Sequence, residues 1–204
     1  MLFLEKYKEI KTESKGFYSE KGSRFVGYCF LVKNKKEVVT KLTALKKIEK
    51  GANHYCFAYV INIDQSEQKI FDDGEPHSTA GRPILQQIKS LELTNILIVV
   101  VRYFGGTKLG IPGLIKAYKS AARNSLNNAK IITENIHEEY LLLFKYHSLN
   151  IIMKKIKCFN LKILKRELNM DCKLTVAIPR TKSDFIIEHF KKERGVEIKF
   201  LNLI

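Results

Sequence analysis

Eight consecutive residues, Asn95–Arg102 (NILIVVVR), constrain the fold of this chain more than any other segment. The segment is almost continuously apolar and rich in β-branched side chains, without the polar alternation of a strand that faces water. This pattern is typical of a strand buried on both faces. A glycine-rich turn follows and leads into a helical pattern from about Gly113 to Ala129. Because a strand buried on both faces needs a layer of structure on each side, the sequence predicts an α/β domain around it.

Periodicity predicts the elements that surround this strand. Asn34 followed by Glu37 has the spacing of a capping box, and it predicts the start of a helix that ends near Gly51. The other elements are a strand at Arg24–Val32, a strand at His54–Ile63, a polar and acidic loop, and a helix from about Thr79 to Leu91. We assign residues 1–133 to this first domain.

After residue 133 the pattern restarts, and we assign residues 134–204 to a second domain. The predicted order is strand, helix, strand, strand, helix, strand, at His137–Lys145, Ser148–Phe159, Leu161–Leu168, Asp171–Ile178, Lys182–Arg194 and Val196–Leu201. This order is that of a ferredoxin-like βαββαβ domain. Thr181 with Asp184 is the expected cap of the second helix. The whole chain is therefore predicted to be α+β, with a short join, because no Pro/Gly-rich linker separates the domains.

The net charge indicates a class of partner. The 204 residues contain 36 Lys and Arg against 21 Asp and Glu, which gives a formal charge of +15. An excess of this size favours a negatively charged partner, and RNA is the leading candidate. A general enrichment in solvated lysine would produce the same excess, so charge alone leaves the partner open.

Hydropathy and cysteine usage indicate the compartment. The longest apolar run, Ile96–Val101, has six residues, far short of the ~20 that a membrane-spanning helix needs. The four cysteines show no Cys-x-x-Cys spacing, and two lie in apolar strand patterns, as buried thiols do in a reducing compartment. We expect a soluble cytoplasmic protein with no zinc site, no disulfide and no membrane interaction.

The first segment that could carry chemistry is residues 72–83 (DDGEPHSTAGRP), named here the acidic turn. Asp72, Asp73 and Glu75 repel one another unless a cation or backbone N–H groups neutralise them. They are candidates for Mg²⁺ ligands or for acceptors of a basic partner, although a turn rich in Gly and Pro also commonly carries solvated acidic residues. His77 beside them is a candidate proton donor or a surface residue.

The second segment is residues 105–113 (GGTKLGIPG), named here the glycine turn. It connects a buried strand to a helix N-terminus, where backbone N–H groups can hold a phosphate, but its spacing matches neither a P-loop nor a dinucleotide-binding fingerprint. The alternative is that the glycines only allow a tight strand-to-helix crossover. Arg102, Lys108 and Lys116 add positive charge around it, and Tyr103 is a candidate stacking surface for a nucleic acid.

Several stretches resemble one family closely. They are Ser23–Tyr28 (SRFVGY), His54–Tyr59 (HYCFAY), Asp72–Pro83, and Asn95–Tyr118 (NILIVVVRYFGGTKLGIPGLIKAY). In this order they are similar to the bacterial YigZ and eukaryotic IMPACT proteins. The resemblance covers essentially the whole chain and is strongest over residues 23–126. The chain departs from the family at Ser78 and Pro112, where relatives usually carry a small residue and a glycine.

The resemblance implies a fold and a biological context. It implies a first domain of the ribosomal protein S5 domain 2-like type, akin to domain IV of elongation factor G, and a ferredoxin-like second domain akin to its domain V. The eukaryotic relatives regulate translation by binding proteins, and for the bacterial relatives the fold suggests association with nucleic acid or the ribosome.

Three hypotheses about function follow. The first is a non-enzymatic module that binds structured RNA or the ribosome through a basic face, without metal or cofactor, since no catalytic constellation is defensible from spacing. The second is a Mg²⁺-dependent enzyme acting on a phosphorylated substrate, with Asp72, Asp73 and Glu75 on the metal and Arg102 and Lys108 on the phosphate. The third is a protein-binding regulator of translation, by analogy with the eukaryotic relatives.

The candidate binding surface combines the two turns. It consists of Asp72, Asp73, Glu75, His77, Thr79, Arg82, Arg102, Tyr103, Gly105, Gly106, Lys108, Gly110 and Lys116. Because each turn precedes a helix, and such connections commonly open on the same edge of a sheet, we expect the turns to meet in space. Arg102 or Lys108 should then pair with one of the three carboxylates.

Overall fold

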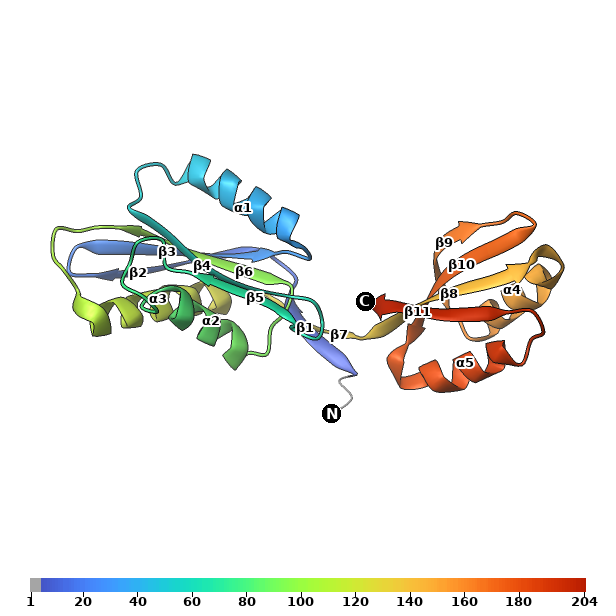
Figure 1. Cartoon of the computed structure of the whole chain (residues 1–204). Coiled ribbons are helices and arrows are strands. Elements are labelled where there is room, and N and C mark those ends of the chain that lie inside the picture. The colour runs from blue at the N-terminus through green and yellow to red at the C-terminus, as the bar shows by residue number, and fades with distance from the viewer. Residues whose placement is uncertain (1–4) are drawn as a thin grey trace. The chain divides into compact units, whose positions relative to one another are not determined.

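The computed structural model describes residues 5–204, which form two compact units (Figure 1). The N-terminal unit comprises Tyr7–Glu134, and the C-terminal unit comprises residues 135–204 together with Glu5 and Lys6. Both units mix helices with antiparallel sheets, so the chain is α+β. Glu5 and Lys6, assigned to the first domain from sequence, thus group with the second unit, and residues 1–4 of that assignment lie outside the described residues.

A five-stranded sheet forms the centre of the N-terminal unit. Its order is β2 (Ser14–Glu20), β3 (Ser23–Leu31), β6 (Ile96–Tyr103), β4 (His54–Ile61) and β5 (Glu67–Phe71), and all neighbours pair antiparallel. Helix α1 (Lys35–Ile48) covers one face, and α2 (Gly81–Ser90) and α3 (Gly110–Asn127) cover the other (Figure 1).

The central strand β6 is buried on both faces, as its composition predicts. Side chains alternate along a strand, and the two sets from β6 join two different cores. Ile96, Ile98 and Val100 pack with residues of α2 and α3, whereas Leu97, Val99 and Val101 pack with Val38 and Leu45 of α1. The apolar run is therefore shared between two layers of helices.

The helix boundaries follow local hydrogen bonding. The capping box of α1 is confirmed, because the Glu37 N–H donates to Asn34 Oδ1 at 3.0 Å and the Glu37 carboxylate accepts from the Lys33 N–H at 2.8 Å. Helix α3 begins at Gly110, three residues before the predicted start. The reason is that Pro112 is compatible with the first turn of a helix, where its missing N–H would have no partner.

Four strands of the N-terminal half were not predicted. They are β1 (Lys6–Ile10), β2, β5 and β7 (Ile131–Asn135). β5 lies within the segment that was expected to be a polar loop, so that expectation was wrong. β2 and β5 are the edge strands of the sheet and are rich in polar and charged residues, which is why they lack the pattern of a buried strand. β1 pairs with β7 (Ile131–Asn135) in a separate two-stranded sheet.

The C-terminal unit has the predicted βαββαβ order. Its elements are β8 (His137–Lys145), α4 (Leu149–Cys158), β9 (Lys162–Glu167), β10 (Asp171–Pro179), α5 (Ser183–Lys191) and β11 (Glu197–Leu203), with short 3₁₀ turns at Tyr146–Ser148 and Arg180–Lys182. The four strands form an antiparallel sheet in the order β11-β8-β10-β9. Residues of both helices pack with alternate residues of β8 and β10 in one core.

The predicted cap of α5 was wrong. The 3₁₀ turn ends at Lys182, which occupies the N-cap position and makes no side-chain capping bond. Thr181 lies within that turn, so it is one residue too early to cap a helix that begins at Ser183.

The cysteines and the helices can be compared with the expectations from cysteine usage and hydropathy. Cys29, Cys56 and Cys172 are buried free thiols, and Cys158 is an exposed one. Across residues 5–204, every helix is too short or too polar to span a lipid bilayer.

Candidate functional site

Asp72, the first residue of the acidic turn, holds the start of α2. Its Oδ1 accepts hydrogen bonds from the N–H groups of Ala80 and Gly81 at 3.0 and 2.8 Å, and its Oδ2 accepts one from Ser78 at 2.9 Å. Ala80 occupies the N-cap position and has no side-chain oxygen that could do this. A carboxylate here satisfies N–H groups that have no partner inside the helix and interacts favourably with the helix dipole. Asp72 is therefore a cap supplied from outside the helix.

Asp73 ties the same turn to the start of β4. Its Oδ2 accepts a hydrogen bond from the N–H of Tyr55 at 2.7 Å, and its carbonyl oxygen lies 2.8 Å from Nδ1 of His54. Asp73 and Gly74 both have positive φ, at 44° and 87°, so the chain reverses direction at this point. The carboxylate stabilises this reversal.

Glu75 is the centre of a buried polar network. Its side chain is 4% exposed, and its Oε1 accepts hydrogen bonds from Nη1 of Arg102 at 2.6 Å and from the hydroxyl of Tyr118 at 2.7 Å. Nε2 of His54 lies 3.9 Å from the same oxygen. The expected pairing of a basic residue with the acidic turn is confirmed for Arg102. The acidic turn therefore meets the end of β6 that leads into the glycine turn, because β4 and β6 bring His54 opposite Arg102.

The surroundings of Arg102 are also closed. Its side chain is 7% exposed, and its guanidinium lies 5.4 Å from the ring centre of Phe25 and 5.5 Å from that of Phe104. A charge placed this deep is stable only when it is paired, so Arg102 and Glu75 depend on each other. The phosphate-binding role considered for Arg102 is therefore not supported, since Arg102 would have to leave Glu75 to reach a ligand.

Cys56 and Tyr118 complete the network without forming a nucleophile. The Cys56 thiol donates to the carbonyl oxygen of Asp72 at 3.0 Å and lies 3.4 Å from the Tyr118 hydroxyl. Burial raises the pKa of the Cys56 thiol well above its usual range, and the negative charges of Glu75 and Asp73 raise it further. Burial likewise raises the pKa of Tyr118. Both groups stay protonated and act as hydrogen-bond donors.

The acidic turn is not arranged as a metal site. Its three carboxylates bind a helix N-terminus, a strand N–H group, and an Arg–Tyr pair respectively. Within residues 5–204, no group of three or more His, Cys, Asp or Glu side chains is placed to hold a metal ion.

Four other residues of the candidate surface have structural contacts. The Thr79 hydroxyl donates to the Pro76 carbonyl at 2.7 Å, and Lys116 lies 3.7 Å from the carboxylate of Glu20. The Tyr103 hydroxyl donates to Glu49 at 2.6 Å. A Cβ on Gly105 would lie 1.9 Å from the carbonyl carbon of Gly22, so glycine is required for the close approach of these two turns. The close approach at Gly105 supports the alternative that the glycines of this turn allow a tight strand-to-helix crossover.

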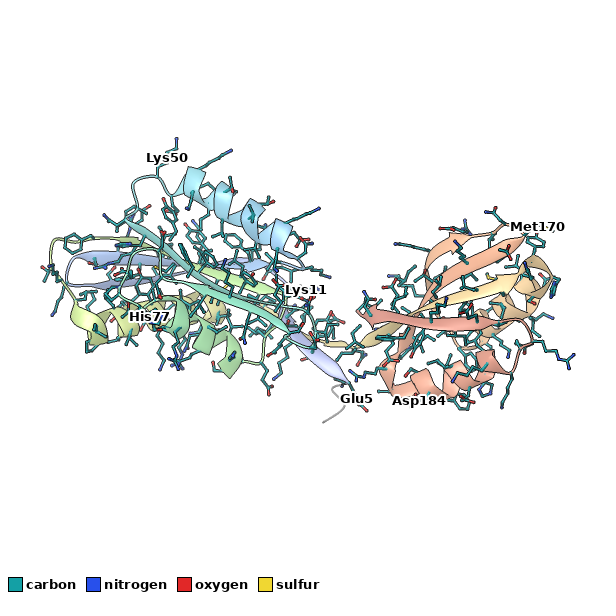
Figure 2. All side chains as sticks on the ribbon, in the orientation of Figure 1. Glu5, Lys11, Lys50, His77, Met170 and Asp184 are labelled. Atoms are coloured by element: carbon teal, nitrogen blue, oxygen red, sulfur yellow. The ribbon has the colours of Figure 1, made fainter. Side chains whose placement is uncertain are left out.

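The remaining candidates face solvent. His77 lies on the surface of the acidic turn (Figure 2), where its Nδ1 is 3.0 Å from the Ser78 hydroxyl. Gly106 and Gly110 are exposed and have positive φ, which the turn requires. Arg82 and Lys108 are exposed and have no ion-pair partner within residues 5–204. This exposed group remains available to a partner.

Sequence reasoning missed a second surface, on the sheet face that α1 covers. Four cations lie over four aromatic rings there: Lys15 over Tyr28 at 4.8 Å, Arg24 over Tyr103 at 4.5 Å, Lys41 over Phe30 at 5.3 Å and Lys46 over Tyr55 at 5.4 Å. We name these eight residues the aromatic-basic face. The signal was the alternation of aromatic residues along the strands, but the cations come from separate segments and only the fold brings them onto the rings.

This face also contains a cavity and the carboxylate of Glu49. A cavity of about 490 Å³ opens between α1 and the strands β2 and β3, lined by Lys15, Tyr28, Phe30 and Lys41 among others. Glu49, just after α1, accepts hydrogen bonds from the hydroxyls of Tyr28 and Tyr103. Burial opposes ionisation of Glu49, but those hydrogen bonds and the charges of Lys15 and Arg24 outweigh it and lower its pKa.

Comparison with known proteins identifies the family. The Impact N-terminal domain model matches residues 21–126, which include both turns and most of the aromatic-basic face. The chain belongs to the IMPACT family. The matched residues end within the last turn of α3, so the family match covers the sheet of the N-terminal unit apart from β2.

Several family members have related sequences. IMPACT family member YvyE of Bacillus subtilis is 40% identical over 56% of this chain, and IMPACT family member YigZ of Escherichia coli is 38% identical over 64% of it. The matches span 52% and 65% of the lengths of those two proteins. An IMPACT family member of Haemophilus influenzae is 31% identical over 85% of this chain and 83% of its own length.

One solved structure shows the same architecture over nearly the whole chain. The crystal structure of a hypothetical protein covers 98% of both chains at 27% identity, with a TM-score of 0.76. A structure of Yih1, described as a two-domain translational regulator, is 22% identical over 58% of this chain and 48% of Yih1, with a TM-score of 0.38. That description belongs to Yih1.

Proposed function

We propose that this IMPACT family chain is a non-enzymatic, translation-associated regulator that binds structured RNA or the ribosome through a basic face. The observation that carries the proposal is the aromatic-basic face, where four cations lie over four aromatic rings on one side of the sheet. Aromatic rings flanked by Lys and Arg are the combination that binds nucleic acids, because bases stack on rings and phosphates pair with the cations. The net charge of +15 supports an anionic partner.

The cations of this face are suited to an external phosphate. Lys15, Arg24 and Lys46 have exposed side chains and no ion pair with a carboxylate among residues 5–204. Lys41 is the exception, since it lies 2.6 Å from Glu13. Lys108, in the glycine turn that follows Tyr103, extends the positive charge to the end of the sheet.

The finer fold assignment supports a link with translation. We infer that the N-terminal unit is of the ribosomal protein S5 domain 2-like type and that the C-terminal unit is ferredoxin-like. The sheet order β11-β8-β10-β9, with both helices packed into one core, supports the second assignment. The family resemblance relates this pair of domains to the RNA-facing domains of a translation factor.

The proposal that the chain is not an enzyme rests on how its polar groups are used. The carboxylates of the acidic turn are engaged in structural contacts, and burial keeps Cys56 protonated. An assay of nucleotide and phosphomonoester hydrolysis, with and without Mg²⁺, tests this point. Turnover near ~1 s⁻¹, lost in Asp73→Ala, would overturn it.

The binding proposal is tested by anisotropy with a labelled RNA hairpin and by cosedimentation with ribosomes. We expect micromolar or tighter binding at about 50 mM salt, with a log–log salt slope of about −0.7 to −0.9 per phosphate contacted. The double variant Arg24→Gln with Lys46→Gln should weaken binding about tenfold or more and make the slope less steep. The matched control is Lys89→Gln with Lys130→Gln, which removes the same charge from exposed positions elsewhere in the same unit.

Two results would contradict the proposal. Equal loss in the double variant and its control would mean that only diffuse attraction acts, without a defined interface. Undetectable binding at low salt would favour the alternative, a regulator that binds a protein partner, which the family resemblance implies for the eukaryotic members. Lys108→Gln, measured in the same series, reports whether the glycine turn belongs to the interface.

A further inference from the structure

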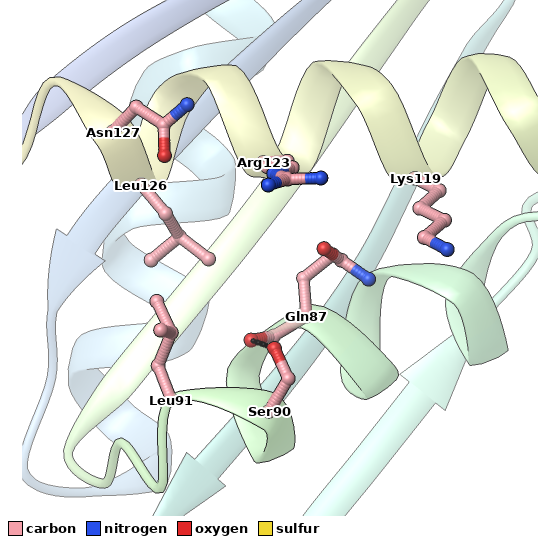
Figure 3. Close-up of a pocket in the computed structure, with 7 residues that line it drawn as sticks. All are labelled: Gln87, Ser90, Leu91, Lys119, Arg123, Leu126 and Asn127. Carbon is pink, nitrogen blue, oxygen red and sulfur yellow. Dashed lines mark hydrogen bonds between the residues drawn. The ribbon is translucent and has the colours of Figure 1, made fainter.

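A cavity between α2 and α3 lies on the sheet face opposite the aromatic-basic face (Figure 3). Its volume is about 380 Å³, within the range of small-molecule sites. Gln87 and Ser90 of α2 line one side, and Lys119 and Arg123 of α3 line the other. The cavity belongs entirely to the N-terminal unit and shares no residue with the network around Glu75.

Gln87 supplies the first indication of a ligand. Its residue exposure is 9%, and its side-chain amide has no hydrogen-bond partner within residues 5–204. Figure 3 shows this side chain reaching from α2 into the space between the two helices. The amide supplies both a donor and an acceptor, so a polar group that enters the cavity can hydrogen bond to Gln87.

Lys119 and Arg123 supply the second indication. They lie four residues apart on α3, so their charged groups are neighbours on the same face of the helix. Both are exposed at the cavity, and neither has a carboxylate partner among the described residues. Like charges at this spacing repel, and an anion held between them would remove that repulsion.

The cavity has an apolar end as well. Leu91 and Leu126 lie at the end away from Lys119 (Figure 3), and Leu126 is 3% exposed. A ligand that fills the space must therefore combine an anionic group with a group that packs against leucine.

We propose that this cavity binds a phosphate monoester of nucleotide size. The phosphate pairs with Arg123 and Lys119, and an oxygen next to it accepts a hydrogen bond from the Gln87 amide. The uncharged part of the ligand, such as a base, packs against Leu91 and Leu126. This site is independent of the RNA interface proposed above, because it lies on the other face of the sheet. The phosphate can come from a free nucleotide or from the phosphorylated end of an RNA strand.

Calorimetric titration of the full chain with AMP tests the proposal. We expect a submillimolar dissociation constant, and at least tenfold weaker binding of adenosine and of inorganic phosphate, since each occupies only one end of the cavity. Arg123→Gln should weaken AMP binding about tenfold or more, and Gln87→Leu about fivefold. Lys89→Gln is the matched control, because Lys89 is an exposed cation of α2 outside the cavity lining.

A second titration distinguishes the two sources of phosphate. A short RNA strand with a 5′-phosphate is compared with the same strand lacking it. Tighter binding of the phosphorylated strand than of the strand without the 5′-phosphate assigns the site to RNA ends, and equal binding of the two strands, with AMP still bound, assigns it to free nucleotides. In both cases Arg123→Gln should remove the preference for the phosphorylated ligand.

Two results would overturn the proposal. One is the absence of AMP binding at millimolar concentration together with no effect of the 5′-phosphate. The other is equal AMP affinity in Arg123→Gln and Lys89→Gln, with circular dichroism showing that both variants are folded.

Discussion

The acidic turn and the aromatic-basic face are both dense in charge, but they use it in opposite ways. In the acidic turn, Asp72, Asp73 and Glu75 are each bound by groups of the same unit. On the aromatic-basic face, Lys15, Arg24 and Lys46 rest on rings and have no carboxylate in an ion pair with them among the described residues. The difference teaches that a binding surface is indicated by exposed charges that form no ion pair, rather than by the density of charge in the sequence.

The largest effect should come from opening the closed network. Glu75→Gln leaves the buried Arg102 without its counter-charge, and breaking a buried pair in this way costs about 3–5 kcal/mol. Urea unfolding of the full chain, followed by a probe of the N-terminal unit, measures the loss. The control is Glu92→Gln, which breaks an exposed pair with Lys8 and should leave the midpoint almost unchanged. Similar midpoints for both variants would show that the network does not stabilise the fold.

A smaller loss of stability is expected from alanine substitutions at two adjacent glycines of the glycine turn, one packed against backbone and one in open space. Gly105→Ala places a Cβ 1.9 Å from the backbone of Gly22, where nothing can yield easily, and should cost about 3 kcal/mol. Gly106→Ala meets no atom within 4 Å but requires an alanine at a φ of 84°, so it should cost about 1 kcal/mol. Unfolding of the two variants under identical conditions checks the order, and a larger loss for Gly106→Ala would contradict the packing explanation.

The smallest effect on stability should come from protonation of Glu49, which accepts hydrogen bonds from two tyrosines of the aromatic-basic face. Because the pKa of Glu49 is lower in the folded chain than its ordinary value, ionised Glu49 stabilises the fold at neutral pH. This contribution is lost as the pH falls below the ordinary carboxyl pKa of about 4.3 and through the lowered value in the folded chain. The measurement is the unfolding midpoint against pH for the wild type and for Glu49→Gln. The variant should be less stable at neutral pH and should show a shallower loss in acid, and parallel curves would contradict this role.

The sequence predicted the fold where the pattern of one segment decided it. The apolar run of β6 and the capping box at Asn34 required no knowledge of distant residues. β2 and β5 escaped prediction because an edge strand is held by backbone hydrogen bonds to one neighbour and can carry polar side chains. The cap of α5 escaped it because a 3₁₀ turn shifted the helix start past Thr181.

The sequence predicted those contacts of the candidate site that follow from the order of strands and helices. The pairing of Arg102 with Glu75 followed from the expectation that the two turns open at one end of the sheet. Glu49, Gln87 and Arg123 were missed, because each has the appearance of an ordinary helix-surface residue in the sequence. Their significance depends on which side chains the fold places beside them.

The capping of α2 by Asp72 has a consequence for how this segment can vary in length. A capping residue that directly precedes its helix tolerates insertions on its N-terminal side. Asp72, in contrast, must reach N–H groups eight and nine positions further along the chain. An insertion or deletion between residues 73 and 79 would move the helix start away from the carboxylate and would also displace Glu75 from Arg102. Related chains should therefore vary the identity of exposed positions such as His77 freely, while keeping the number of residues between Asp72 and Gly81 constant.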